Sequence, residues 1–322
     1  MALAAGGFEM RDARAEHNVP NSDGTEAPKL EAPANACDCH MHIYDTERFP
    51  VARPGSRLQS NARVAEYRLL QQRLGTRRTV IVTPAPYATT NDVTLDAIAQ
   101  LGPDARGVAV VTPEVSDAEL RRLVDGGIRG IRFTQFDPAT AVTTLDMIEP
   151  LSKRVNELGW HVQIHLRGDQ IAAAADLLTR LPSTVVFDHM GRLPQPDGTG
   201  HAAYRIIRQM LDKGRTWVKL SGAYLDTRTG APRYADAVQV AESYFKAAPE
   251  RMVWGSDWPH RPRRTSRTTP CCSIFSPNGH PTMRRVDACW SKIRKRSTAL
   301  PRAPDRRSPR PLSSNRARPW SR

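Results

Sequence analysis

Short apolar runs and longer amphipathic stretches alternate along most of this 322-residue chain, and the alternation limits its possible folds. Eight runs rich in β-branched residues have the length of buried strands, at residues 36–44, 79–83, 107–111, 128–133, 161–166, 184–187, 217–220 and 252–255. Helical patterns lie between them, for example at residues 66–74, 116–124, 145–158, 170–178, 202–211 and 234–245. Eight alternations predict an α/β fold of the (β/α)8 TIM barrel type.

An open, doubly wound sheet is the alternative architecture. That fold would place a glycine-rich phosphate-binding loop after its first strand. The first predicted strand here ends instead in Asp38-Cys39-His40-Met41-His42. Residues i and i+2 of a strand point to the same face, so His40 and His42 are expected to point together into the mouth of the barrel.

The chain divides into three segments by composition. Residues 1–35 mix glycine, alanine, proline, asparagine and charge without a period, which predicts a mobile leader. Residues 36–260 form the predicted barrel. Residues 261–322 hold nine prolines and no helical period, which predicts a disordered tail and a barrel that lacks its native last helix.

The formal net charge of +14 belongs to that tail. Residues 261–322 contain 17 Lys and Arg against 2 Asp, which leaves 30 basic and 31 acidic residues in the first 260. A basic tail of this kind permits a hypothesis of another class, a nucleic-acid-binding arm. Only Phe275, Trp290 and Trp320 accompany the charge as stacking aromatics, so nucleic acid is not the expected partner.

A shifted reading frame is a further explanation of the tail. Permitted codons for residues 272–280, read in another frame, give Leu-Phe-Asp-Leu-Leu-Ala-Glu-Trp-Ala, an amphipathic helix. Residues 290–300 in the same frame give Leu-Val-Glu-Asn-Pro-Gln-Thr-Leu-Tyr-Gly-Phe. Our hypothesis is a single-base frameshift near His260 or Arg261, in which case this chain is the inactive product of a broken gene or a misread one.

Sequence features relevant to location are few. No apolar run approaches the roughly 18 to 20 residues of a membrane span, so no membrane partner is expected. The first residues lack the basic and apolar regions of a signal peptide, and five cysteines form no disulfide framework or zinc spacing. We expect a cytoplasmic protein, or a periplasmic one if the start is mis-assigned; the oligomeric state stays open.

Histidines and one aspartate follow the predicted strands where a barrel carries its active site. His40 and His42 end the first strand, His165 the fifth, His189 follows the sixth, and Asp257 follows the eighth. One strand histidine is usually structural, but four with a carboxylate favour a catalytic site. In that setting Asp257 is the expected general base that takes a proton from water.

The segments around these residues resemble the amidohydrolase superfamily. They read Asp-Cys-His-Met-His, Trp-His-Val-Gln-Ile-His, Phe-Asp-His-Met-Gly and Trp-Gly-Ser-Asp-Trp-Pro-His. Over residues 34–260, these segments are similar to those of the branch that contains 2-pyrone-4,6-dicarboxylate hydrolase and related lactonases. The resemblance implies hydrolysis of a small carboxylated lactone, with Asp257 activating water and the histidines polarising the carbonyl group.

The resemblance leaves the reaction and the metal open. Sugar-lactone hydrolysis and lactone isomerisation on the same fold are the alternatives. It implies either no cofactor or one divalent ion, zinc or manganese, held by His40, His42, His165 and Asp257. Arg132 and Thr134 end the fourth strand where a binuclear centre would need a carbamylated lysine, so such a centre is not expected.

Six residues are candidates for substrate binding. A carboxylate needs fixed cations, and guanidinium groups suit it because they bind both oxygens. Arg132 is the first candidate, followed by Arg192, Arg228 and Tyr224, while Tyr87 and Asn91 are candidate donors to a lactone oxygen. Lys219 lies between Val218 and Leu220, so its side chain is as easily expected to point outward toward a helix.

Overall fold

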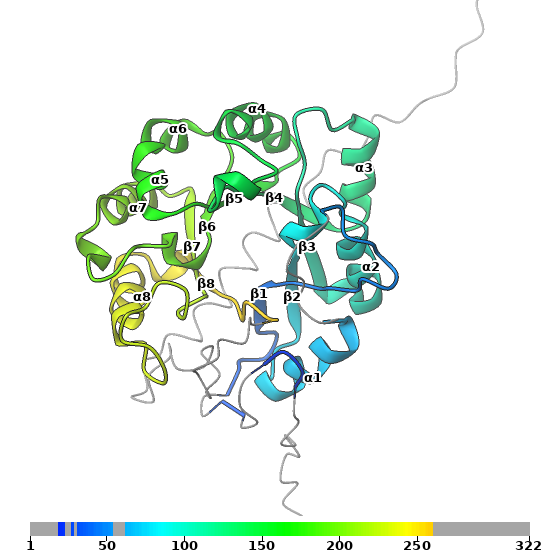
Figure 1. The fold of residues 1–322 in the computed structure, drawn as a ribbon, viewed down its shortest axis with the longest axis horizontal. Helices are drawn as coiled ribbons and strands as arrows, with labels where there is room; N and C mark the ends of the chain where they lie inside the picture. The colour runs from blue at the N-terminus through cyan, green and yellow to red at the C-terminus, as the bar shows by residue number, and fades with distance from the viewer. Residues whose placement is uncertain (1–18, 23–26, 29–30, 54–61, 260–322) are drawn as a thin grey trace, which may run out of the picture.

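Eight parallel strands form a barrel in the computed structural model, which describes residues 19–22, 27–28, 31–53 and 62–259. The strands follow one another around it in sequence order (Figure 1): β1 Cys37–Met41, β2 Arg78–Val82, β3 Ala105–Ala109, β4 Ile128–Thr134, β5 His161–His165, β6 Val185–Phe187, β7 Thr216–Leu220 and β8 Met252–Trp254. Each overlaps a run expected from the sequence. The predicted TIM barrel is therefore confirmed.

Helices cover the outside of the barrel (Figure 1): α1 Val64–Leu74, α2 Asp92–Leu101, α3 Asp117–Asp125, α4 Leu145–Asn156, α5 Gly168–Ala173, α6 Ala175–Arg180, α7 Ala202–Asp212 and α8 Ala235–Ala247. The expected cap of α3 is present, because Ser116 Oγ accepts a hydrogen bond from Glu119 N at 3.1 Å. The single helix expected at 170–178 is divided into α5 and α6 at Ala174.

The strands are buried on both faces. Val80, Val82 and Val108 form a small cluster of their own, whereas Ile81, between the two valines of β2, belongs to the large core that the helices share. Parallel strands covered on both sides read as continuous apolar runs, because neither face is left to water. Sequence alternation therefore does not tell which strand residues point inward.

The barrel closes where β1 meets the segment that follows β8. Asp257 N donates to His40 O at 2.7 Å, and His42 N donates to Trp258 O at 2.7 Å. Met41 and Trp258 form a parallel bridge at the same place. Three of the four residues in these two hydrogen bonds, His40, His42 and Asp257, are candidate functional residues of the sequence.

Part of the predicted leader lies against this closure. Val19 is fully buried, the Trp258 indole donates to Pro20 O at 2.9 Å, and the Arg73 guanidinium donates to Ser22 Oγ. Residues 19–22 of the predicted mobile leader are therefore held against the barrel by these contacts. The predictions made for residues 261–322, including the missing last helix, lie outside the described residues.

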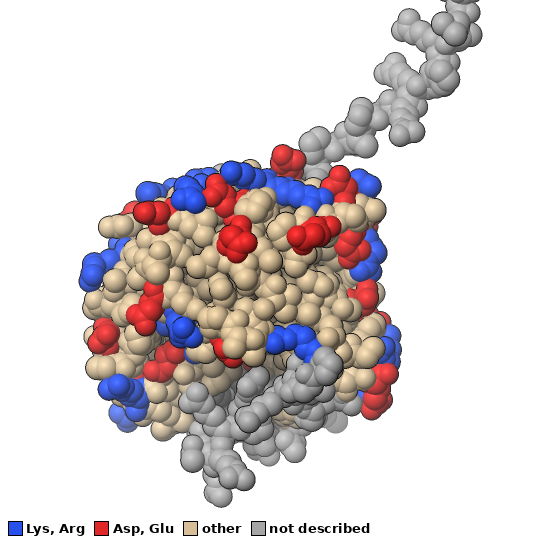
Figure 2. All heavy atoms as spheres, turned by 45° about the horizontal axis from the view of Figure 1, so that its top comes forward, with Lys and Arg blue, Asp and Glu red and all other residues tan. Residues whose placement is uncertain are grey.

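The described surface carries mixed charge. On the face drawn in Figure 2, Lys and Arg side chains are interspersed with Asp and Glu, as the near-neutral composition of the first 260 residues predicts. None of the described helices is both long enough and apolar enough to cross a membrane.

Candidate active site

A register shift in β1 precedes the first two histidines. The pairing of β1 with β2 shifts between Asp38 and Met41, as in a β-bulge. Asp38 is turned toward α1, where its carboxylate accepts from Tyr67 OH at 3.1 Å. His40 and His42 then converge inside the barrel, with their Nε2 atoms 3.2 Å apart. The expectation that both point into the barrel is confirmed.

The ring of His42 is oriented by the neighbouring strand. His42 Nδ1 lies 2.8 Å from the carbonyl oxygen of Val82, which can only accept a hydrogen bond. Nδ1 therefore carries the proton of the neutral ring, and Nε2 presents a lone pair to the site. Burial lowers the pKa of His42 to about 3, so the ring is neutral at pH 7.

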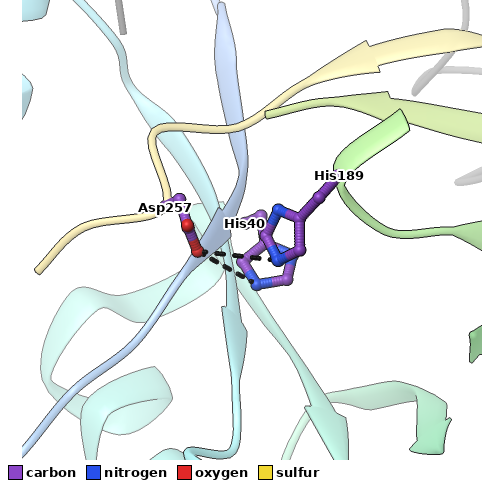
Figure 3. Close-up of side chains that lie close together, drawn as sticks. All are labelled: His40, His189 and Asp257. Carbon is purple, nitrogen blue, oxygen red and sulfur yellow. Dashed lines mark ion pairs between the residues drawn. The ribbon is translucent and has the colours of Figure 1, made fainter. Parts of the chain in front are cut away.

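Asp257 lies among three imidazole rings. Its Oδ1 atom is 3.6 Å from His40 Nε2, 3.8 Å from His42 Nε2 and 3.9 Å from His189 Nε2. Figure 3 shows the rings of His40 and His189 on one side of this carboxylate, with Asp257 entering from the segment after β8. Three of the four predicted histidines, His40, His42 and His189, therefore form one cluster with Asp257.

The other oxygen of Asp257 is held by a phenol. Tyr224 OH donates to Asp257 Oδ2 at 2.7 Å. Burial raises the pKa of Asp257 to about 6, although the Tyr224 hydrogen bond acts in the opposite direction. A carboxylate with such a pKa is deprotonated at neutral pH and can still accept a proton from water, as a general base must.

Asp188 and His189 both reach the site because the chain turns after β6. His189 has a φ of 49°, which is uncommon for a residue other than glycine, and lies in a short 3-10 turn that follows Asp188. Two consecutive side chains of a strand would point to opposite faces. Here both lie beside His40, with Asp188 Oδ1 3.4 Å from His40 Nδ1 and the His189 ring centroid 4.7 Å from that of His40. His189 Nδ1 lies 2.9 Å from Ser221 Oγ.

Beneath the histidines lies a buried ionic network centred on Asp188. Arg132 Nε donates to Asp188 Oδ2 at 2.8 Å, and Lys219 Nζ lies 3.3 Å from Asp188 Oδ1. Burial alone would raise the pKa of Asp188, but Lys219 and Arg132 hold it well below its usual range. The network therefore contains two cations and one fixed anion, which leaves a positive potential beside the site.

Lys219 also contacts the first histidine. Its ammonium lies 3.0 Å from His40 Nδ1 and 2.9 Å from Gln163 Oε1, and its side chain is 1% exposed. Burial, and then Lys219, hold the pKa of His40 well below its usual range, so His40 is neutral. The open question about Lys219 is settled: its side chain points into the barrel.

His165 lies beside His189, with ring centroids 5.2 Å apart, and does not contact Asp257 in the described structure. Its Nε2 atom lies 3.2 Å from Arg192 Nη1, and its ring stacks on Phe136 with centroids 5.5 Å apart. Arg192 lies over the same Phe136 ring at 4.0 Å and forms a bidentate pair with Asp226 at 2.6 and 2.9 Å. The surroundings of His165 therefore combine an aromatic ring with an oriented guanidinium.

The remaining candidates for substrate binding have diverse positions. Tyr87 is buried and accepts a hydrogen bond from Asp45 N. Asn91 is also buried, and both amide hydrogens are used by Thr89 O and Val110 O. Arg228 is exposed on the loop after β7. Of the six, Arg132 contacts Asp188, Tyr224 contacts Asp257, and Arg192 contacts His165.

Sequence reasoning missed three polar residues of this network. Asp188, Gln163 and Lys219 are 0%, 1% and 1% exposed, values that ionic or amide side chains reach only when they are paired. The sequence alone assigns no role to Asp188, the aspartate of the segment Phe-Asp-His-Met-Gly. The sequence does contain a sign of this network, because charged residues within apolar strand runs require buried partners.

The side chains of the cluster include groups that could bind a metal ion. Among the described residues, His40, His189 and Asp257 each offer a ligand atom within 4.8 Å of the others, a spacing that can hold one ion. A histidine ligand normally donates its other ring N–H to an acceptor. His40 Nδ1 lies nearer to the Lys219 ammonium, at 3.0 Å, than to the carboxylate oxygen Asp188 Oδ1, at 3.4 Å. The spacing suits a metal, but the hydrogen bonding of His40 does not.

Known proteins share this sequence pattern. A family model described as Amidohydrolase matches residues 37–270. The chain is 33% identical over 242 residues to 2-pyrone-4,6-dicarboxylate hydrolase from Comamonas testosteroni, covering 72% of this chain and 79% of that protein. It is 32% identical to 4-sulfomuconolactone hydrolase from Rhizobium radiobacter, covering 71% and 77%, and 28% identical to D-galactarolactone isomerase from Agrobacterium fabrum, covering 76% and 83%.

Solved structures share the fold. A protein from Agrobacterium tumefaciens superimposes with a TM-score of 0.73 at 24% identity, over 82% of this chain and 98% of that one. An amidohydrolase from Burkholderia multivorans with bound zinc does so with a TM-score of 0.54 at 18% identity, over 84% and 94%. On the family match and the Comamonas relative, the chain belongs to the amidohydrolase family.

Proposed function

We propose that this protein hydrolyses the ring ester of a small carboxylated lactone, of the 2-pyrone-4,6-dicarboxylate type. The observation that carries the proposal is the position of Asp257, whose Oδ1 atom lies within 3.9 Å of three imidazole Nε2 atoms. The named activities of the relatives support the substrate class, because all three act on lactones.

Asp257 begins the reaction as a general base. Its carboxylate takes a proton from a water molecule, and the resulting hydroxide attacks the lactone carbonyl carbon. The carbonyl oxygen becomes negative and is stabilised by imidazole N–H groups and by the positive potential of Arg132 and Lys219. The ring C–O bond then breaks, and the leaving oxygen takes the proton from Asp257, which yields a hydroxy acid.

Arg132 and Arg192 are the proposed anchors for substrate carboxylates. Arg132 uses Nε to bind Asp188, while its two Nη nitrogens donate no hydrogen bond to any described residue. Arg192 is oriented by Asp226 beside His165 and Phe136. A flat, anionic ring placed against this surface would present its ester carbonyl to the histidines. Tyr87, Asn91 and Arg228 are not assigned a role.

A metal ion remains compatible with the spacing of His40, His189 and Asp257. Zinc or manganese there would supply a Lewis acid and lower the pKa of a bound water. The steps above need only the side chains of this chain.

The test is an assay of the purified full-length chain with pyrone dicarboxylate and with aldonolactones. Ring opening is followed by proton release, and the product is identified by NMR. We expect one acid equivalent per turnover, and about 10²- to 10⁴-fold slower turnover in Asp257→Asn. Rearrangement without acid release would instead support an isomerase, and a folded protein that opens none of these rings would reject the proposal.

A further inference from the structure

The environment of the Lys219 ammonium is unusual for a buried cation. Three atoms surround it: Gln163 Oε1 at 2.9 Å, His40 Nδ1 at 3.0 Å and Asp188 Oδ1 at 3.3 Å. An ammonium group has three hydrogens to donate and no lone pair to accept with. Each of its neighbours must therefore present an acceptor, and one of those acceptors is a ring nitrogen of His40.

We propose that Lys219 is a positioning residue that fixes His40 as the tautomer with its proton on Nε2. This inference rests on the proposed function only where it assigns that proton a role in the reaction. Lys219 donates to His40 Nδ1, so Nδ1 is unprotonated, and the single proton of the neutral ring resides on Nε2. Nε2 is the ring atom that faces Asp257 and the reaction.

The neighbouring histidine has the complementary arrangement. His42 donates from Nδ1 to Val82 O, which leaves its Nε2 as an acceptor. His40 Nε2 and His42 Nε2 are 3.2 Å apart, and their rings are nearly perpendicular at 84°. A proton on His40 Nε2 and a lone pair on His42 Nε2 give this contact one donor and one acceptor. The other tautomer of His40 would bring two lone pairs together.

Asp188 provides the alternative partner that Lys219 excludes. Asp188 Oδ1 lies 3.4 Å from His40 Nδ1 and 3.3 Å from the Lys219 ammonium, so it is within reach of both groups. If Nδ1 carried the proton, that oxygen would accept it, and His40 Nε2 would be left as a lone pair. Lys219 therefore decides between a ring that donates into the site and a ring that can bind a metal.

The consequence for the reaction is a defined donor. His40 Nε2–H can turn from His42 to the carbonyl oxygen of the substrate, where negative charge develops. The same proton prevents His40 from acting as a metal ligand. Loss of Lys219 should therefore weaken stabilisation of the oxyanion and strengthen metal binding, two effects with opposite directions.

The direct test is NMR of the full-length chain labelled with ¹⁵N at histidine. Long-range proton–nitrogen correlations show which nitrogen of each neutral ring carries the proton, and the nine histidines allow His40 to be assigned by comparison with His40→Gln. We expect Nε2–H at His40 and Nδ1–H at His42. Protonated Nδ1 at His40 in the wild-type chain would overturn the proposal, whatever the enzyme turns over.

A substitution tests the role of the ammonium. Lys219→Met keeps the length of the side chain and removes its donors, so the His40 proton should move to Nδ1. Competition with a chromophoric chelator should then show zinc binding about tenfold or more tighter than in the wild type. Lys153→Met, at an exposed position of α4, also removes one positive charge. It should change neither the His40 tautomer nor zinc binding.

The outcomes separate this inference from the proposed function. An unchanged His40 tautomer or weaker zinc binding in a folded Lys219→Met protein would contradict the role of Lys219. If that variant fails to fold, the wild-type NMR result alone decides. Absence of lactone turnover with Nε2–H at His40 would reject the function and leave the tautomer assignment intact.

Discussion

Asp257 contacts His40 twice, once through the backbone and once through the side chains. Asp257 N donates to His40 O at 2.7 Å, and Asp257 Oδ1 lies 3.6 Å from His40 Nε2. A displacement of the segment after β8 therefore changes the distance between base and imidazole directly. Closure of the barrel and placement of the proposed base depend on the same pair of residues.

The pH dependence of turnover should report Asp257. Its folded pKa of about 6 is raised by burial, so protonation removes the proposed base as the pH falls through this value. We expect kcat/KM in the presence of chelator to be constant above about pH 7 and to fall tenfold per pH unit well below 6. A profile that stays level down to pH 4 would exclude Asp257 as the base.

Tyr224→Phe should move that acidic limb. The Tyr224 hydroxyl donates to the charged form of Asp257, so its loss favours protonation and raises the pKa of Asp257. A hydrogen bond to a charged group contributes about 1.5–3 kcal/mol, which corresponds to roughly one to two pH units. The limb should shift to higher pH in kcat/KM profiles. Tyr204→Phe serves as the control. It removes a hydroxyl of α7 that contacts Ser243, away from Asp257, and should leave the acidic limb in place.

Asp188→Asn should destabilise the fold. The substitution leaves Lys219 and Arg132 buried beside each other without their shared anion. Breaking a buried ion pair from one side costs about 3–5 kcal/mol, which urea unfolding would measure as a lower midpoint. Asp117→Asn, which removes an exposed partner of Arg154, should cause much less change. Equal effects of the two substitutions would refute the structural importance of the network.

Gly255→Ala should disturb the closure of the barrel. An added Cβ would lie 2.6 Å from His40 Cβ and 2.8 Å from His40 N, and the second of these is a backbone atom that cannot move alone. We expect a loss of about 1–3 kcal/mol of stability with a clear loss of turnover. Gly200→Ala has open space around its new Cβ and provides the matched control. Full activity of Gly255→Ala would show that β1 can shift without harm.

The sequence was sufficient for the barrel because strand and helix patterns repeat in a fixed order. It also identified His40, His42, His189 and Asp257, which the strand-end rule of this fold brings together. The sequence could not tell which way the Lys219 side chain points, because both faces of β7 are buried and Lys219 has an apolar neighbour on each side in the sequence. Nor could it predict that the left-handed backbone of His189, directly after Asp188, would leave both side chains beside His40.

The hydrogen bonds that join β1 to the segment after β8 also set the order of events during synthesis. His40 leaves the ribosome more than two hundred residues before Asp257, so the earlier part of the chain must wait with its first strand unpaired on one side. No catalytic centre can exist until the last part of the barrel has been translated. Enzyme activity in a growing culture would therefore report only chains translated past Asp257, and products truncated before that residue would be silent in the assay.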